Sequence, residues 1–305
     1  MEIAFNEDQV TFTTFLDQML GSDDAAFRAV PGWGRHDYGT ALDEQLEANG
    51  FFDAAAEETL GPVMAAEMVY KIARLPVVVE CAASALLRPL IAPELPRPIA
   101  VIEGDALASR FLPVARSAIW LSPEGVRAAT LPQGAAGEVE SLFAYPMGRI
   151  DGPAPEWKPL EVDPARALAL WRIGLAAELS GALQGGLASV LEHVRERRQF
   201  GRPLGSFQGV QHRLAADTVQ IEAARLLTLK AAQSGGAADA ALALGQAQTA
   251  ATRIIYDLHQ FMGAMGLTLE HPLHRMTYRA RLLRAAMGGA TRSLRSYADA
   301  RWGAA

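Results

Sequence analysis

The sequence predicts a mainly α-helical protein with a small β domain in the middle of the chain. Two observations carry this prediction. Apolar residues recur with the period of about 3.6 residues of amphipathic helices in residues 1–95 and again in residues 161–305. Between them, residues 96–160 hold short apolar segments bounded by glycine, proline or aspartate, as short strands do. We therefore expect an N-terminal helical domain (1–95), a small β domain (96–160) and a C-terminal four-helix bundle (161–305).

The N-terminal helices are predicted from apolar residues that share one helix face. Breaks in the pattern are expected at residues 31–34 and 49–50, where glycines interrupt it. Four prolines between Arg88 and Pro98 then end the helical pattern. The residues of the apolar face are Phe12, Phe15, Leu16, Met19 and Leu20, followed by Leu42, Leu46, Leu60, Met64, Met68 and Ile72.

Four strands are predicted in the β domain, at residues 99–102, 117–121, 126–130 and 141–145. Each segment is short, and turn-forming residues separate it from the next.

Long helices are predicted for the C-terminal domain, at about residues 163–199, 205–233, 236–264 and 272–300. Asp163 followed by Pro164 is a good pair for the N-cap and first position of the first of them. Short connections between helices of this length force neighbours to run antiparallel, so we expect a bundle.

Composition and charge exclude several classes of protein. The formal net charge of −6 does not fit a nucleic-acid-binding surface, which needs a basic excess. Cys81 is the single cysteine, so no disulfide is expected, and its apolar surroundings favour a buried, inert thiol. The start of the chain lacks the pattern of a signal peptide, and no apolar run is long enough to span a membrane. We expect a cytoplasmic protein that is not bound to a membrane.

The segment from Arg195 to Leu214 is the most informative in the chain. Arginines at 195, 197, 198 and 202 precede a glycine break and the start of the next helix, near Gly205. A guanidinium group can donate two parallel hydrogen bonds to the oxygens of one phosphate. Free N–H groups at a helix start add positive potential, so the segment fits a diphosphate. The alternative is a solvated helix end, where cations offset the negative pole of the helix dipole.

Two motifs resemble the C-terminal domain of the flavin-dependent acyl-CoA dehydrogenases. The first is Arg197-Arg-Gln-Phe-Gly with Phe207-Gln-Gly-Val-Gln-His-Arg-Leu, and the second runs from Gln260 to Arg275. The resemblance implies an FAD cofactor, with Phe207 and Gln208 meeting it across a subunit interface, and the second motif reaching its adenosine half. Ala264 stands where the family usually has a glycine. The implied cofactor-binding residues are Arg197, Gln199, Phe200, Phe207, Gln208, Gln260, Gly263 and Ala264.

The glutamate that acts as catalytic base in the active family is missing. The resemblance places Met287 at one of the two positions that carry it and Trp171 at the other, and neither side chain can take a proton. The catalytic residue is therefore unknown, with Glu178 and Glu270 as candidates if the chain works alone. Glu270, His271 and His274 could suggest a metal, but Pro272 marks a helix start that His271 or Glu270 would cap, so no metal is expected.

The missing base, a shortened β domain and an absent flavin loop together suggest a partner. The chain resembles the short subunits of bacterial α2β2 acyl-CoA dehydrogenases, several of which oxidise CoA thioesters of steroid fragments. This implies α,β-dehydrogenation of an acyl-CoA within a heterotetramer with a full-length acyl-CoA dehydrogenase, and an electron-transferring flavoprotein as acceptor. Two alternatives stay open: a self-sufficient homo-oligomeric enzyme with an unrecognised base, and a non-catalytic structural subunit.

Overall fold

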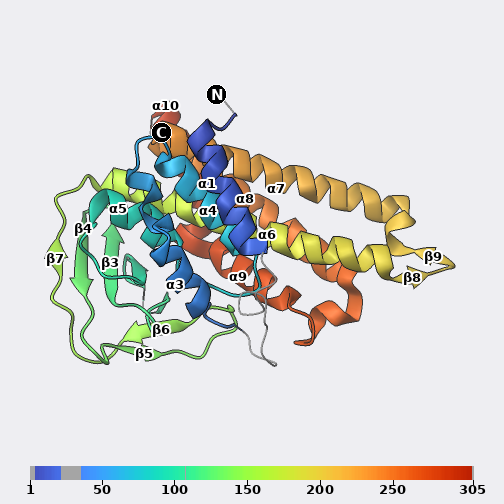
Figure 1. The fold of residues 1–305 in the computed structure, drawn as a ribbon, viewed down its shortest axis with the longest axis horizontal. Helices are drawn as coiled ribbons and strands as arrows, with labels where there is room; N and C mark the ends of the chain where they lie inside the picture. The colour runs from blue at the N-terminus through green and yellow to red at the C-terminus, as the bar shows by residue number, and fades with distance from the viewer. Residues whose placement is uncertain (1–3, 22–35, 107, 304–305) are drawn as a thin grey trace.

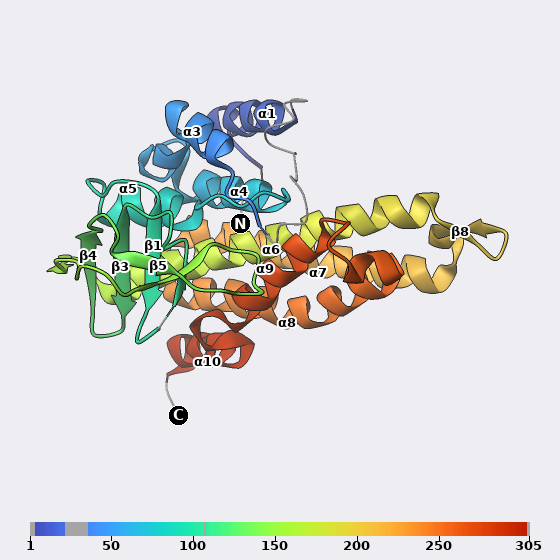
Figure 2. The same ribbon diagram turned by 90° about the horizontal axis from the view of Figure 1, so that it is seen from below.

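The computed structural model describes residues 4–21, 36–106 and 108–303. Figure 1 shows the β sheets at one end of the molecule and the long helices running from them to a small hairpin at the opposite end. Turned by 90° (Figure 2), the N-terminal helices lie on one side of the long helices and the last helix lies on the other. The predicted class, mainly α with a small β domain, is confirmed.

The N-terminal region is helical throughout its described part. Its elements are α1 (Glu7–Gly21), α3 (Thr40–Ala48), the 3-10 helix η1 (Phe51–Ala56), α4 (Gly61–Ala73), the π-helical turn η2 (Ala83–Leu87) and α5 (Arg88–Ile91). The predicted break at 49–50 is confirmed, because Asn49 caps α3 and Gly50 has a positive φ of 71°. The predicted break at 31–34 lies outside the described residues.

Two small sheets follow. β1 (Ile99–Glu103), β3 (Ser117–Ser122), β4 (Gly125–Thr130) and β7 (Lys158–Pro159) form one in that order, with β1 parallel to β3 and the other pairs antiparallel. β2 (Ser109–Arg110), β6 (Met147–Ile150) and β5 (Ala136–Glu138) form the other, in the order β2-β6-β5. The parallel register sets Glu103, the last residue of β1, beside Leu121.

The strand predicted at residues 141–145 is wrong. These residues form bends, and the strand of this region, β6, begins at Met147. Ala144 has a φ of 54°, a left-handed conformation that no strand tolerates, and Pro146 follows shortly after. The apolar run therefore marks a turn whose Tyr145 side chain is buried.

Five helices form most of the C-terminal part: α6 (Pro164–Glu196), α7 (Gln208–Ser234), α8 (Ala237–Met262), α9 (Leu273–Ala285) and α10 (Gly289–Trp302). The hairpin of β8 (Arg198–Gln199) and β9 (Arg202–Pro203) and the 3-10 helix η3 (Leu204–Ser206) connect α6 to α7, and η4 (Gly263–Leu267) follows α8. The predicted cap of α6 is confirmed: the Asp163 carboxylate accepts the Ala165 N–H at 3.0 Å, and Pro164 begins the helix.

Two predicted helix boundaries are wrong. The single helix expected at residues 272–300 is broken at η5 (Ala286–Gly288), because Met287 and Gly288 have left-handed φ values of 53° and 86°. The break makes a corner between α9 and α10, and the Met287 N–H in this corner donates to Glu103 at the end of β1. The helix expected to begin near Gly205 begins at Gln208, after η3.

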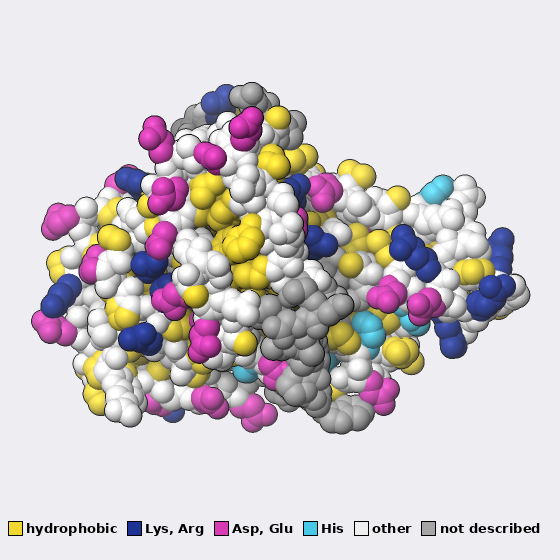
Figure 3. Space-filling view, viewed as in Figure 1, with side chains coloured by type: hydrophobic (Ala, Val, Ile, Leu, Met, Phe, Trp, Pro, Cys, Tyr) yellow, Lys and Arg dark blue, Asp and Glu magenta, His cyan; other side chains and the backbone are white. Residues whose placement is uncertain are grey.

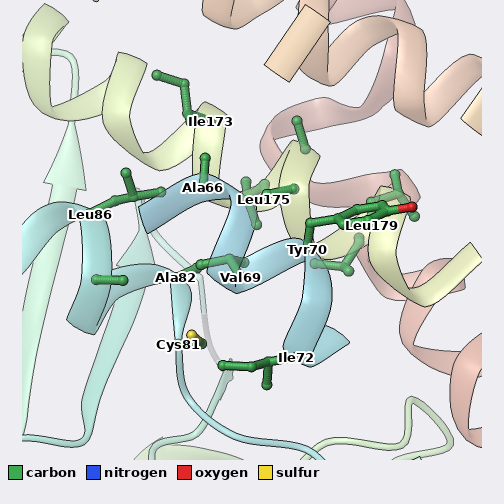
Figure 4. Close-up of a cluster of buried hydrophobic side chains, with 14 of the residues drawn as sticks. Ala66, Val69, Tyr70, Ile72, Cys81, Ala82, Leu86, Ile173, Leu175 and Leu179 are labelled. Carbon is green, nitrogen blue, oxygen red and sulfur yellow. The ribbon is translucent and has the colours of Figure 1, made fainter. Parts of the chain in front are cut away.

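The core lies where α4 and the segment 81–87 pack against α6, as Figure 4 shows. Ala66 and Tyr70 of α4 lie beside Leu175 and Leu179 of α6 in that view, and Val69 lies beside Ala82. Small residues allow the two helices to approach: a Cβ on Gly181 would lie 2.2 Å from the carbonyl oxygen of Tyr70. Cys81 is buried, and burial raises the pKa of its thiol well above the ordinary value, as expected for an inert thiol.

No helix in the described part of the chain is long and apolar enough to cross a membrane. The domain boundaries near residues 95 and 160 stay a prediction.

Candidate functional site

A cavity of about 580 Å³ lies between the β domain and the helices. Most of its lining comes from residues 101–106 and 108–110 around β1 and β2, from residues 168–175 of α6, and from residues 282–292 at the corner between α9 and α10. Leu121, Pro123 and Met147 add to it. Three segments far apart in the sequence therefore meet here. We call it the Glu103 cavity, after the carboxylate that links all three.

Glu103 joins the walls of the cavity through both of its carboxylate oxygens. Oε1 accepts the indole N–H of Trp171 at 2.7 Å, and Oε2 accepts the backbone N–H of Met287 at 3.0 Å. Glu103 is the last residue of β1, and its side chain reaches Trp171 on α6. One acidic side chain therefore connects β1, α6 and the α9–α10 corner.

Trp171 and Met287 are the two residues that the sequence analysis placed at the positions of the missing base. The structure brings both to the Glu103 cavity, although they are far apart in the sequence. Trp171 is buried on α6, and Met287 is half-buried at the broken corner. Neither side chain can exchange a proton, and their assignment to the positions of the base stays a prediction.

Glu178, a candidate base in the sequence analysis, does not line the cavity. Its carboxylate accepts Arg110 at 2.5 Å and the hydroxyl of Tyr145 at 2.7 Å, and all three side chains are buried. Burial alone would lower the pKa of Arg110, but the Glu178 charge outweighs it and raises the pKa. Glu178 therefore serves as the counter-ion of Arg110, whose guanidinium lies 5.2 Å from the ring centroid of Trp171.

Glu270, the other candidate base, is exposed beyond the end of α8 and is not among the residues of the cavity. The neighbouring His271 caps the start of α9, as predicted, because its Nδ1 accepts the Leu273 N–H at 3.1 Å.

Two arginines complete the cavity wall. Arg172, next to Trp171 on α6, has a buried Nε with no hydrogen-bond partner, and burial and the charge of Arg292 lower its pKa. Arg292, from α10, lies over Gly288, where a Cβ would come within 2.6 Å of its Cδ. Sequence reasoning missed Glu103, Arg110 and Arg292, because isolated charges carry no pattern until the fold brings them together.

The first group of predicted cofactor-binding residues lies on the β8–β9 hairpin and just after it. Arg197, Gln199, Phe200 and Gln208 are exposed, and Phe200 is 87% exposed. The side chains of Arg197 and Gln199 make no hydrogen bond or ion pair with any described residue. The half-buried Phe207 lies under the guanidinium of Arg202, 4.1 Å from its ring centroid. In Figure 3, dark-blue side chains gather at the right-hand end of the molecule, over this hairpin.

The second group lies at the end of α8, on the side of the bundle that carries the hairpin (Figure 1). Gln260, Gly263 and Ala264 are exposed. Gly263 has a φ of 68°, and no atom lies within 4 Å of where its Cβ would be, so its backbone is open to a ligand. These residues therefore form an accessible surface, and their contact with a cofactor stays a prediction.

None of the eight predicted residues lines the Glu103 cavity. Trp171 and Arg197 stand at opposite ends of α6, and at a rise of 1.5 Å per residue their separation along the helix is about 39 Å. Within this chain the predicted flavin residues therefore lie far from the cavity that holds Trp171 and Met287.

Comparison with known proteins identifies the C-terminal half. Residues 164–300 match the family described as "Acyl-CoA dehydrogenase, C-terminal domain". This part of the chain belongs to that family. A curated relative, the 3-sulfinopropanoyl-CoA desulfinase of Paraburkholderia xenovorans strain LB400, is 39% identical over 129 residues, which cover 41% of this chain and 33% of that one. The chain thus spans about a third of that relative's length.

Solved structures share the acyl-CoA dehydrogenase fold over the whole chain. The "Tcur3481-Tcur3483 steroid ACAD G363A variant" superposes with a TM-score of 0.78 and 21% identity, covering 96% of this chain and 97% of that one. The ChsE4-ChsE5 complex from Mycobacterium tuberculosis superposes with a TM-score of 0.73 and 20% sequence identity, covering 97% of this chain and 97% of that one. Because both superpositions cover nearly the whole chain, the N-terminal helices and the small β domain also have the acyl-CoA dehydrogenase fold.

Proposed function

We propose that this chain is the base-lacking subunit of a heteromeric, FAD-dependent acyl-CoA dehydrogenase. The observation that carries the proposal is the separation of about 39 Å, along α6, between the cavity residue Trp171 and the diphosphate candidate Arg197. In FAD a ribityl chain of five carbons joins the ring to the diphosphate, and at about 1.5 Å per bond it spans on the order of 9 Å. Arg197 would therefore hold an FAD whose ring lies in another chain, either a second copy or a different subunit. The lack of a proton acceptor on Trp171 and Met287 favours a different subunit that supplies the base.

The exposed residues of the hairpin and of the α8 end fit the diphosphate and adenosine half of FAD. Arg197 offers a planar fork of donors with no competing carboxylate, which suits a diphosphate. Gly263 offers open backbone for a close approach. Bound FAD would supply a flavin ring that accepts the hydride leaving the β-carbon of the acyl group. This chain's residues would hold its far half and leave proton removal to the partner.

The surface around these residues supports a partner. Several exposed apolar side chains lie on α7, α8 and the loop after α8, the elements that carry or adjoin the flavin motifs. They are Val219, Tyr256, Met265, Leu267 and Leu269, and the hairpin adds Phe200. Apolar surface of this kind marks an interface with another protein chain. We propose a full-length acyl-CoA dehydrogenase subunit as that partner.

The acyl group and electron acceptor are proposed from the relatives. The superposed structure described as a steroid enzyme, and the complex of two named chains, favour a steroid or other bulky acyl-CoA in a heterotetramer. An electron-transferring flavoprotein is the proposed acceptor, because acyl-CoA dehydrogenases pass electrons to it.

Purification of this chain alone and with a full-length acyl-CoA dehydrogenase from the same genome tests the proposal. Flavin absorbance and native mass are measured for each preparation. We expect flavin and turnover only in the mixed oligomer, and Arg197→Ala should lower its flavin content. A flavin-containing, active homo-oligomer from this chain alone contradicts the proposal. A mixed oligomer whose flavin content is unchanged by Arg197→Ala points to a structural subunit.

One observation favours a second candidate, the self-sufficient enzyme. Glu103 is a carboxylate in the cavity, directly between the two positions of the missing base. If it takes the α-proton, then Glu103→Gln on this chain abolishes turnover while the exposed Glu270→Gln does not. Its two oxygens already accept N–H groups, which leaves it less free to accept a proton and ranks this candidate second.

A further inference from the structure

Helix α10 lies on the outside of the molecule and is attached to the bundle along one side. Figure 2 shows it on the side of the long helices opposite the N-terminal helices. The hydroxyl of Ser293 donates to the Gln248 side chain of α8 at 2.9 Å, and Leu294 lies against Gly245 of the same helix. The exposed residues on the other side of α10 are therefore available to a second molecule.

The exposed side of α10 combines arginines with a large aromatic side chain. Trp302 is 73% exposed, and its ring meets that of Tyr297 edge-on, with centroids 5.4 Å apart. Arginine and tryptophan are enriched among the residues that dominate binding between proteins. Five residues share this side at the spacing of one helix face, and we call them the α10 face: Leu294, Arg295, Ala298, Arg301 and Trp302.

The end of the chain is basic, although the whole chain is acidic. The last 35 residues contain seven arginines, no lysine and one acidic residue, against a formal net charge of −6 for the chain. That acidic residue, Asp299, lies 3.9 Å from Arg295 on the surface of the same helix, where such pairs contribute little. Asp239, whose charge interacts with that of Arg301, already pairs with Lys230 at 3.1 Å. The α10 face therefore has a net positive charge.

A second copy of this chain does not fit the α10 face. In a two-fold dimer a patch at the interface meets the same patch of the other copy, so the arginines of both copies would face one another. Like charges set against each other cost free energy and exclude the wrong partner. The face therefore favours a different chain with an acidic surface over a homodimer.

An anionic membrane is the other candidate for a basic helix. Helices that lie on membranes bury a broad apolar face in the lipid. The α10 face has only two large apolar side chains, Leu294 and Trp302, and Leu294 already packs against α8. A protein surface therefore fits the α10 face better than a lipid surface does.

We infer that the α10 face binds an acidic surface of the partner chain and selects that chain over a second copy of this one. The partner is the full-length subunit proposed above, so the inference rests on the proposed function and adds the surface that decides the pairing. Arg295 and Arg301 attract the acidic surface during its approach, and Trp302 anchors the complex once it has formed.

Binding kinetics with the full-length acyl-CoA dehydrogenase subunit from the same genome, carrying its flavin, test the inference. The double variant Arg295→Glu with Arg301→Glu should lower the association rate constant roughly tenfold or more at about 50 mM salt, and much less at about 500 mM. Trp302→Ala should mainly raise the dissociation rate constant. The control, Arg116→Glu with Arg166→Glu, changes the net charge equally at exposed side chains that form no ion pair with a described residue.

Equal kinetics of the wild type and both α10 variants would overturn the inference and leave the proposed function standing. An effect of the control as large as that of the α10 double variant would also overturn it, because net charge alone would then explain the result. A wild-type chain that does not bind the subunit would refute the proposed function and the inference together. Binding to vesicles of anionic phospholipid that only the α10 double variant abolishes, with unchanged binding to the subunit, would assign the face to a membrane instead.

Discussion

The carboxylate of Glu103 accepts the indole N–H of Trp171 at 2.7 Å, so the end of a β-strand is tied to the longest helix of the protein. The same carboxylate accepts the backbone N–H of Met287. Trp171 and Met287, at which the sequence analysis expected the missing base, therefore lie on either side of one carboxylate.

Replacing Glu103 by Gln should destabilise the protein by about 1–3 kcal/mol. An amide offers one acceptor oxygen, so its NH₂ group must face one of the two N–H donors. Urea unfolding measures the change in the free energy of unfolding. Glu94→Gln, at an exposed residue with no hydrogen bond or ion pair in the described part of the chain, is the control. Equal stability of the two variants would show that the Glu103 contacts contribute nothing.

Glu178→Gln should cost about 3–5 kcal/mol, because it leaves the buried Arg110 without its counter-ion. Replacement of both residues, Arg110→Met with Glu178→Leu, should recover much of this loss because no charge is then left buried. Denaturant titration of the single and the double variant checks both statements. A double variant that is no more stable than the single one would argue against an unpaired charge as the cause.

Gly181→Ala should destabilise the contact between α4 and α6 by about 1–3 kcal/mol, the usual cost of overpacking. Its Cβ would lie 2.2 Å from the carbonyl oxygen of Tyr70, and backbone cannot move aside easily. The matched control is Gly209→Ala in the first turn of α7, where no atom lies within 4 Å and the variant should lose no stability. Thermal unfolding of both variants gives the comparison, and a shift of the same sign in both would contradict the packing argument.

Arg197→Ala should weaken FAD binding by the mixed oligomer roughly tenfold to a hundredfold, since a charge-assisted contact to the diphosphate is lost. Arg197 is exposed and caps the end of α6, so its loss should change the stability of the protein by less than about 1 kcal/mol. Flavin titration and thermal unfolding separate the two effects. A change in stability without a change in flavin affinity would favour the solvated helix end.

Asp217→Asn should remove a pH dependence of stability. Burial, and then the charge of Asp257, raise the pKa of Asp217 to about 6 from the ordinary 3.8, although Arg253 and Arg213 oppose the shift. The folded state therefore binds the proton more tightly than the unfolded state. The stability that this proton contributes is fully present below pH 3.8 and is lost as the pH rises through about 6.

The melting temperatures of the wild type and Asp217→Asn, followed from pH 4 to 7, check this dependence. The advantage of the asparagine variant should grow over this range. A constant difference between the two proteins would exclude titration of Asp217 as the cause.

Periodicity and capping residues in the sequence predicted the fold class and most of its helices. The start of α6 is set by neighbouring residues alone, because Asp163 caps the helix and Pro164 occupies its first position. The sequence also predicted that Trp171 and Met287 stand at the positions of the missing base, and this stays a prediction. It failed at the break after α9 and at residues 141–145, where single residues with positive φ override an apolar pattern.

Only the tertiary structure decided what surrounds those residues. Glu103, Trp171 and Met287 meet because β1 ends against α6 and because the α9–α10 corner turns toward both. The length of α6 separates this cavity from the hairpin that carries Arg197. Local sequence sets dihedral preferences and caps within a few residues, whereas contacts between distant segments depend on how whole helices and sheets pack.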